Sequence, residues 1–362
     1  MDGKAGEGDG GRQNAARGTF SLAAGGISCK NAAMSEKPPV QVPGSAPRVS
    51  VVGPVYNVLP WLDRCLESLR TQTFRDFETI LVDDGSTDGC AARCDEWAAR
   101  LPRCKVVHQP NGGLANARNS GIAAASGEWV ACVDSDDYVA PDYLAYLLDL
   151  AESNGVSLAA GQCVQTTGGP LPDDAGADSA GVEVSRDRTE SCEWLQEGTR
   201  LTDTIWGKIY RRELLLSIPH PDGRVHEDTA IIGRLVYAAG RIAVGHRAPY
   251  GYFVNEGSII HTPGRRRLED QLWANLERVR FYREVREPAL ERMAWEKLAK
   301  TVLWDIKTDA LPVADLRAFC RQAGMPFAGL ATAKCRIALR FPRLYRLESR
   351  LKGFPKRRQK TD

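Results

Sequence analysis

From Arg48 onward, short apolar runs rich in β-branched residues alternate with stretches of helical periodicity. The runs predict strands near residues 50–52, 78–82, 105–107 and 128–133. The stretches between and after them predict helices over residues 59–72, 90–100, 114–125 and 141–154. Strands that alternate with helices of this length form βαβ units. We therefore expect an α/β fold with a largely parallel sheet that is covered by helices on both faces.

The flanking regions are patterned differently. Residues 1–47 are rich in Gly, Ala, Ser and Pro and lack periodicity, so we expect a disordered leader in which Met34 could be the true start. Residues 166–183 are rich in Gly, Asp and Pro and predict a loop. From Arg265 to the end the pattern is helical and finishes in a basic segment, 336–362. Between these regions, the pattern predicts helices near 190–197 and over 228–239, and strands near 241–245 and 250–254.

The composition is that of a folded protein. Hydrophobic residues make up 43% and charged residues 26% of the 362 residues, which argues against wholesale disorder. The formal net charge of +2 gives no overall bias toward nucleic acid. No run approaches the roughly 18 apolar residues of a membrane-spanning helix, and the apolar patch at 22–29 is too short and glycine-interrupted for a signal peptide.

The 10 cysteines are scattered along the chain. The closest pair, Cys90 and Cys94, has the spacing of one helical turn and lacks a second close pair of cysteines or histidines, which disfavours a zinc site. We expect reduced and mostly buried thiols and a cytoplasmic protein.

Polar residues gather where three of the predicted strands end. The first strand runs into Pro54, Tyr56 and Asn57, the second into the segment 83–88 and the fourth into the segment 134–137. In open α/β sheets, ligands bind beyond the carboxyl ends of the strands. This coincidence is the first functional signal in the sequence.

The segment DDGSTD at 83–88 has two readings. It could be a turn whose Ser86 or Asp88 caps the following helix. Alternatively, one of the carboxylates of Asp83 and Asp84 accepts a charge-assisted hydrogen bond from a ring N–H of a nucleobase such as uracil.

The run Asp134-Ser135-Asp136-Asp137 could be a solvated acidic turn. An EF-hand-like calcium loop is excluded, because Val139 and Ala145 stand where such a loop needs Gly and Glu. The remaining alternative is a divalent cation held by one or two carboxylates together with substrate phosphates. A cation there would neutralise the concentrated negative charge.

Two further segments carry candidate chemistry. NGGLANARNSG at 111–121 is either a glycine-rich turn with a surface arginine, or an anion cradle made by helix-start amides and Arg118. Glu227 and Asp228 open a predicted helix, where acidic residues are ordinary partners of the helix dipole. Either carboxylate could instead act as a general base. His226 beside them is expected to be hydrogen-bonded rather than to bind metal, because no second histidine is suitably spaced.

The order of these segments resembles the family-2 glycosyltransferases of the GT-A fold, especially bacterial enzymes of surface-polysaccharide synthesis. The resemblance spans residues 48–262 and rests on VSVVGPVYNVLPWLDRCLESLRTQTFRDFETILVDDGSTD, NGGLANARNSGIAAASGEWVACVDSDD, WGKIYRREL, GRVHEDTAIIGRLVYAAG and YGYFVNEGSI. The chain departs from the family's pattern at Gly53, where a bulky aliphatic residue is usual, and in the long insertion at 166–183.

The resemblance implies roles for individual residues. Pro54, Tyr56 and Asp84 would line the nucleoside, and Asp134 would face the ribose and diphosphate. Asp136 would bind Mn²⁺ or Mg²⁺. Asp228 would be the catalytic base, with Glu227 the reserve candidate.

The implied organisation is a disordered leader over 1–47, a GT-A domain over 48–262 and a helical, basic extension over 263–362. Residues 48–140 would form the nucleotide-binding half of the domain and residues 141–262 the acceptor half. The predicted activity is inverting transfer of a sugar from a nucleotide-diphospho-sugar, in the first place a UDP-sugar, to a hydroxyl of a glycan or lipid-linked saccharide.

Two other functions compete with this prediction. One is a non-catalytic subunit that binds a nucleotide sugar in support of another transferase. The other is a nucleotide-dependent oxidoreductase, which is disfavoured because the sequence lacks the GxGxxG fingerprint. The basic C-terminus, with Arg and Lys among Leu, Ile, Phe and Tyr, is either a helix that caps the domain or a peripheral anchor on the inner face of the cell membrane.

Overall fold

The computed structural model describes residues 45–101, 103–171, 181–254, 264–326 and 329–351. All of them fall within one compact unit, Pro43–Asp362. The predicted leader lies outside the described residues up to residue 44, as do the possible start at Met34, the centre of the 166–183 loop and the last residues of the basic C-terminus.

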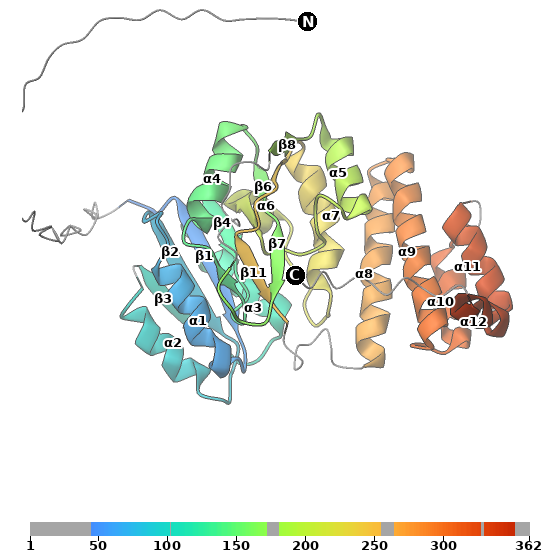
Figure 1. The fold of residues 1–362 in the computed structure, drawn as a ribbon, viewed down its shortest axis with the longest axis horizontal. Helices are drawn as coiled ribbons and strands as arrows, with labels where there is room; N and C mark the ends of the chain where they lie inside the picture. Colours follow the sequence, from blue (N-terminus) through green and yellow to red (C-terminus); the bar gives the residue numbers. More distant parts are fainter. Residues whose placement is uncertain (1–44, 102, 172–180, 255–263, 327–328, 352–362) are drawn as a thin grey trace, which may run out of the picture. The chain divides into compact units, whose positions relative to one another are not determined.

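The main sheet has eight strands in the order β3-β2-β1-β4-β9-β6-β10-β8 (Figure 1). Its strands are β1 (Val49–Val55), β2 (Phe77–Asp83), β3 (Cys104–His108), β4 (Trp129–Cys132), β6 (Leu158–Ala160), β8 (Val182–Val184), β9 (Lys208–Arg211) and β10 (Ala243–Gly245). Strands β3, β2, β1 and β4 are mutually parallel, and so are β6 and β10. Strand β9 is antiparallel to both of its neighbours, and β8 is antiparallel to β10. The predicted, mostly parallel sheet is confirmed.

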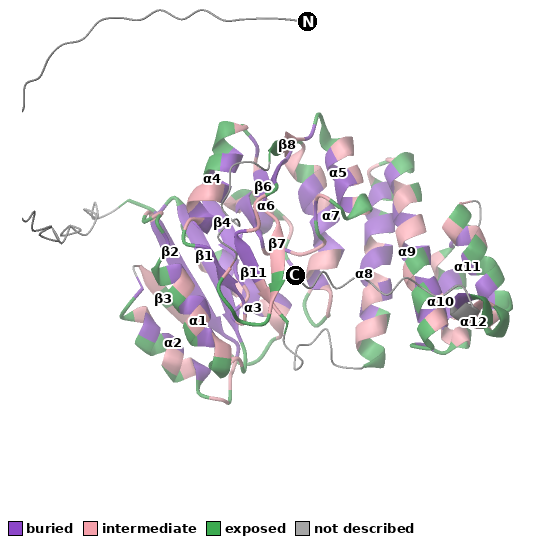
Figure 2. Ribbon diagram, in the orientation of Figure 1, coloured by how far each residue is buried: buried purple, intermediate pink, exposed green. Residues whose placement is uncertain are grey.

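Helices cover both faces of this sheet, as predicted. They are α1 (Leu59–Arg70), α2 (Cys90–Ala98), α3 (Leu114–Ala124), α4 (Tyr143–Ser153), α5 (Arg188–Glu197), α6 (Arg212–Ser217) and α7 (Glu227–Ala239). Successive residues of a strand point to opposite faces, so Val51 joins the apolar core under α1, α2 and α4, whereas Val52 joins the core under α3, α5 and α7. Figure 2 shows the strands buried between these layers.

Helix α1 shows how the sequence sets the packing. It begins with Pro60 in its first turn, where the missing N–H costs no hydrogen bond. Leu62, Cys65, Leu66 and Leu69 recur at helical spacing and are all buried.

Strand β1 continues unbroken through Gly53. A Cβ at this position would lie 3.3 Å from Cδ2 of Leu81, so the neighbouring leucine fills the space that a larger residue would occupy.

A smaller sheet, in the order β5-β11-β7, lies beside the carboxyl end of β4. It consists of β5 (Tyr138–Val139), β7 (Cys163–Thr166) and β11 (Tyr250–Phe253). Trp206, which precedes β9, stacks on Tyr250 with ring centroids 4.6 Å apart and on Tyr252 at 5.5 Å. The stack ties the loop before β9 to this smaller sheet.

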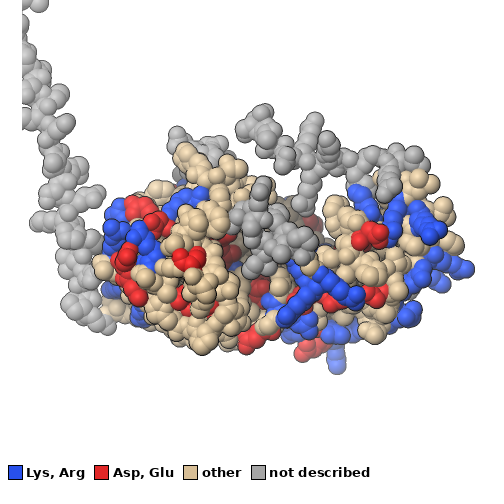
Figure 3. Space-filling view, turned by 90° about the horizontal axis from the view of Figure 1, so that it is seen from below, with Lys and Arg blue, Asp and Glu red and all other residues tan. Residues whose placement is uncertain are grey.

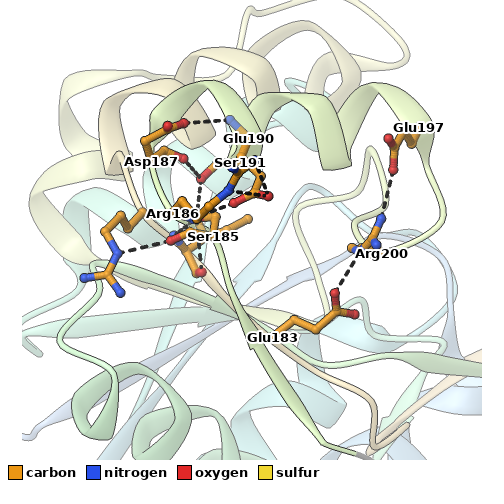
Figure 4. A network of polar contacts seen from close by, with 10 residues as sticks. Glu183, Ser185, Arg186, Asp187, Glu190, Ser191, Glu197 and Arg200 are labelled. Atoms are coloured by element: carbon orange, nitrogen blue, oxygen red, sulfur yellow. Dashed lines mark hydrogen bonds and ion pairs between the residues drawn. The ribbon is translucent and has the colours of Figure 1, made fainter.

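Edge strand β8 is fixed by a polar network at its junction with α5 (Figure 4). Asp187 caps α5 by accepting a hydrogen bond from the amide of Glu190, whose carboxylate in turn accepts one from the amide of Arg186. Arg200 lies between the carboxylates of Glu183 and Glu197, at 2.9 Å from each. These contacts hold the strand in place where the chain returns after residue 180.

The C-terminal region is helical, as predicted. It comprises α8 (Arg265–Glu284), α9 (Pro288–Thr308), α10 (Val313–Ala323), α11 (Leu330–Arg340) and α12 (Pro342–Leu351). Helix α8 packs on α7, and α9 packs on α5, α8 and α11, so these helices extend one apolar core outward from the sheet. None of the helices in the described residues has the length and apolar content to cross a bilayer.

The prediction that the cysteines are mostly buried is confirmed for the described part of the chain. Seven of its nine cysteines are buried, and all nine are free thiols.

Candidate active site

The ends of β1 and β4 lie side by side and build the floor of the site. The ladder between these strands stops at Val52 and Cys132, so Pro54 follows without costing a hydrogen bond to β4. Pro54 is buried, and its carbonyl oxygen accepts a hydrogen bond from Oγ of Ser135 at 2.6 Å. Tyr56 follows the strand with 47% of its surface exposed. Pro54 therefore fixes the acidic turn, while Tyr56 lies open to solvent.

The three carboxylates of the run 134–137 point to different partners. Asp134 accepts a hydrogen bond from Nη2 of Arg118 at 2.7 Å. Asp137 is buried and accepts from the hydroxyl of Tyr250 at 2.6 Å and from the amide of Phe253 at 2.7 Å. Asp136 is half-buried, and among the described residues only its own amide donates to its carboxylate. Asp136 is thus the carboxylate of this run that is most available to a ligand.

Burial and like charge explain the proton affinities of this turn. Burial, together with the neighbouring charge of Asp134, raises the pKa of Asp136 to about 6. The same causes raise the pKa of Asp137 to about 8, although Tyr250 opposes the shift. A cation beside Asp134 and Asp136 would relieve this repulsion, and carboxylate oxygens are the ligands that Mg²⁺ and Mn²⁺ prefer. The donor set therefore fits the metal that the sequence predicted.

A metal cage made of protein ligands alone is a different kind of site. Within the described ranges, no three His, Cys, Asp or Glu side chains are grouped closely enough to form one. The predicted site uses one or two carboxylates together with substrate phosphates.

Arg118 joins the acidic turn to helix α7. It lies on α3 and is only 1% exposed. Its Nη2 donates to Asp134, and its Nη1 donates to Oε1 of Glu227 at 2.5 Å. Burial opposes the charge of the guanidinium, but Asp134 and Glu227 raise its pKa above the usual range. Protein carboxylates thus engage both terminal nitrogens of this side chain, and its predicted part in an anion cradle stays a prediction.

Glu227 and Asp228 form the first turn of α7, as predicted, but their surroundings differ. Glu227 is buried against Arg118. The carboxylate of Asp228 is partly exposed and accepts a hydrogen bond from the amide of Thr229 at 2.7 Å. Burial raises the pKa of Asp228, and the charge of Arg118 opposes this shift. Burial also raises the pKa of Glu227 to about 7 against the pull of Arg118. Asp228 is therefore the less constrained carboxylate.

His226 precedes these two residues in the left-handed conformation, with φ of 64°. The prediction that it is hydrogen-bonded is not met at Nε2, which is buried without a partner.

Asp84 organises the glycine-rich loop rather than standing free. Its Oδ1 accepts hydrogen bonds from the amide of Gly112 at 2.9 Å and from Nε2 of Gln109 at 2.7 Å, and its Oδ2 accepts from the amide of Gly113 at 2.8 Å. In the same segment, Asp88 accepts a hydrogen bond from the amide of Cys90 at the start of α2 at 3.1 Å, whereas the N-cap position itself is Gly89.

Two residues that were not predicted complete the site. Arg64 on α1 donates from Nη2 to the carbonyl of Asp136 at 2.7 Å, and its guanidinium lies over the rings of Tyr138 and Phe253. The hydroxyl of Tyr250 contacts both Asp137 and the amide of Asp134. The sequence offered no signal for either contact, because each joins residues that are more than 70 positions apart.

The chain is similar to known proteins. The model of the family "Glycosyl transferase family 2" matches residues 50–216. The uncharacterised glycosyltransferase EpsJ of Bacillus subtilis is 32% identical over 241 residues, covering 65% of this chain and 70% of its own. The uncharacterised glycosyltransferase YibD of Escherichia coli is 32% identical over 240 residues, covering 63% of this chain and 68% of its own.

A solved structure shows the same fold. The crystal structure of Staphylococcus aureus TarS 1–349 in complex with UDP-GlcNAc superposes with a TM-score of 0.62 and 23% identity, covering 84% of this chain and 92% of that one. The GT-A fold expected from the sequence is thereby confirmed. With relatives this similar over more than two thirds of their length, the chain belongs to glycosyl transferase family 2.

Proposed function

We propose that this glycosyltransferase transfers a sugar from a UDP-sugar to a hydroxyl of a glycan or lipid-linked saccharide in cell-surface polysaccharide synthesis, with inversion at the anomeric carbon. The observation that carries the proposal is the bridge made by Arg118, which holds Asp134 and Glu227 and leaves Asp136 and Asp228 for substrate. The UDP-GlcNAc bound to TarS supports a UDP-sugar as the first donor to test.

In this proposal the two halves of the GT-A domain have separate tasks. Residues 48–140 bind the donor, with Pro54, Tyr56 and Asp84 lining the nucleoside and Asp134 facing the ribose and diphosphate. Residues 141–262 receive the acceptor. The proposed location of the enzyme is the cytoplasmic face of the cell membrane, because a lipid-linked acceptor is presented at a membrane surface.

The chemistry would run in one displacement. Asp228 takes the proton of the acceptor hydroxyl, whose oxygen forms a bond to the anomeric carbon while the bond from that carbon to the diphosphate oxygen breaks. The electron pair leaves with the nucleoside diphosphate. Asp136 would hold Mn²⁺ or Mg²⁺, which supplies Lewis-acid stabilisation of the departing diphosphate when bound. Arg118 acts indirectly by orienting Asp134.

The test is release of UDP in the presence of Mn²⁺ from UDP-glucose, UDP-galactose and their N-acetyl forms, with binding of each donor measured in parallel. We expect turnover of one donor by the parent protein. Asp136→Ala should lose metal-dependent donor binding, whereas Asp228→Asn should keep donor binding and lose turnover.

Two outcomes would change the proposal. Turnover by Asp228→Asn equal to that of the parent, with loss in Glu227→Gln, would move the base to Glu227. Binding of a donor without turnover by the parent, even with candidate acceptors added, would favour the non-catalytic subunit.

A further inference from the structure

Helices α11 and α12 present a groove lined by exposed apolar side chains, here called the apolar groove. Its main residues are Leu330, Ile337, Phe341, Leu344 and Leu347, and its volume is about 770 Å³. Leu330 is 88% exposed, Leu344 64% and Ile337 63%. Single exposed apolar residues are ordinary, but a contiguous set marks an interaction surface.

The spacing of these residues shows that the groove is a built feature of the helix pair. Ile337 follows Leu330 by seven positions, which places both on one stripe of α11, and Phe341 is the C-cap residue at the end of this helix. Leu344 and Leu347 are three positions apart on α12 and lie on its corresponding stripe. Both helices pack on α9. The buried residues of α11 include Cys335 and Leu339, which lie on the face opposite the exposed stripe. The exposed apolar residues are therefore not needed for packing on α9.

The charge around the groove is strongly positive. Residues 313–351 contain eight Lys or Arg against two acidic residues, a net charge of +6. Lys334 lines the groove itself together with Glu348, and Arg336, Arg340 and Arg343 are exposed beside it on α11 and α12. Figure 3 shows Lys and Arg gathering at the end of the molecule formed by α10–α12.

We infer that the apolar groove docks on an anionic lipid bilayer, with its leucines, isoleucine and phenylalanine at the acyl boundary and its basic rim against the headgroups. Exposed apolar side chains combined with a Lys/Arg rim are what an anionic interface accommodates. The inference adds a membrane-docking surface to the proposed function. It rests on that proposed function only for the use of a lipid-linked acceptor.

Other occupants fit this charge less well. Residues 352–362 carry five Lys or Arg and one acidic residue, so they share the sign of the rim. A second copy of the chain would bring two basic rims together across the interface. An acidic protein would match the rim but would also need an apolar ridge, whereas a bilayer supplies both features at once.

The experiment uses the full chain and sedimentation with large vesicles of phosphatidylcholine alone, or with about one third phosphatidylglycerol. The parent should partition at least about tenfold better onto the anionic vesicles, and this preference should shrink with added salt. Leu344→Glu with Leu347→Glu should lower that partition by about tenfold or more. Leu216→Glu changes an exposed leucine on α6 and is the matched control, which should bind like the parent.

A further double variant separates the contributions of charge and apolar contact. Lys334→Gln with Arg343→Gln should reduce binding to anionic vesicles and leave the weak binding to phosphatidylcholine unchanged. Circular dichroism and UDP binding, measured on every variant, should match the parent, so that a failure of docking is distinguishable from a failure of the proposed function.

Three results would overturn the inference. The parent could fail to bind anionic vesicles, or the groove and control variants could bind equally. Alternatively, light scattering could show a dimer of the parent that Leu344→Glu with Leu347→Glu dissolves, which would assign the groove to a second copy.

Discussion

Nη1 of Arg118 on helix α3 donates to Oε1 of Glu227 in the first turn of helix α7, at 2.5 Å and out of contact with solvent. The same guanidinium holds Asp134 at the end of strand β4 through Nη2. One buried cation thus fixes the position of the donor-side carboxylate relative to the helix that carries Asp228. The two proposed halves of the site share this bridge.

Replacing Arg118 should therefore damage both stability and transfer. Arg118→Met leaves the carboxylates of Asp134 and Glu227 without their shared cation, and we expect a loss of about 3–5 kcal/mol in the free energy of unfolding. Arg118→Lys keeps the charge, but a single ammonium group cannot replace the planar guanidinium that donates to both carboxylates. It should therefore still lose most transfer activity. Urea unfolding and donor turnover measure the two effects.

The control for Arg118→Met is Arg70→Met. Arg70 also contacts a glutamate, Glu67, but the pair is about half exposed, so its loss should change the free energy of unfolding by less than about 1 kcal/mol. Unfolding of Arg118→Met at the same urea concentration as the control would refute the role of the bridge.

The contacts of Arg118 are also an example of features that could not be predicted from the sequence. Strands β1 to β4 and helices α1 to α4 could be predicted because their apolar periodicity is local, whereas the two-residue strand β5 was missed. Strand β9 could not be, because its four residues pair antiparallel with β4 and β6 through tertiary contacts. The carboxylates of Asp134, Asp136 and Asp137 look equivalent in sequence. Partners 16 and 113 positions away, Arg118 and Tyr250, make them different.

The pH dependence of transfer should reflect the proposed base. Asp228 acts only when deprotonated, and burial raises its pKa above the ordinary 3.8. Activity should therefore be lost as pH falls through this raised pKa, so the acid limb of the turnover profile lies above pH 3.8. The measurement is kcat against pH with saturating donor, in parallel with circular dichroism to exclude acid unfolding. An acid limb at or below pH 3.8 would contradict the assignment of Asp228 as the base.

Tyr250 is expected to hold the acidic turn through its hydroxyl alone. Tyr250→Phe keeps the ring that stacks on Trp206 but removes the donor to Asp137, leaving the buried carboxylate with the amide of Phe253 as its one remaining donor. We expect a loss of about 1–3 kcal/mol in the free energy of unfolding, measured in urea. Tyr252 lies on the same strand, and its hydroxyl has no carboxylate hydrogen-bond partner in the described part of the chain, so Tyr252→Phe should be near neutral. Equal stability of the two variants would contradict this role of the Tyr250 hydroxyl.

Asp305 on helix α9 is a buried carboxylate whose two oxygens lack a hydrogen-bond partner among the described residues. Burial raises its pKa from 3.8 to about 6, although the charge of Arg267 opposes the shift. Since the folded state binds this proton more tightly than the unfolded state, the contribution of Asp305 to stability is present below pH 3.8. It is lost as pH rises to about 6, at a cost of about 3 kcal/mol.

Asp305→Asn removes this titration and should be more stable than the parent by about 1–3 kcal/mol at pH 7.5. The gain should shrink toward zero near pH 4, because the parent carboxyl is then protonated and also neutral. Urea unfolding at both pH values measures the difference. Asp149→Asn, an exposed carboxylate on α4, is the control and should shift stability little at either pH. A gain that is equal at the two pH values would show that the effect comes from packing rather than from the buried charge.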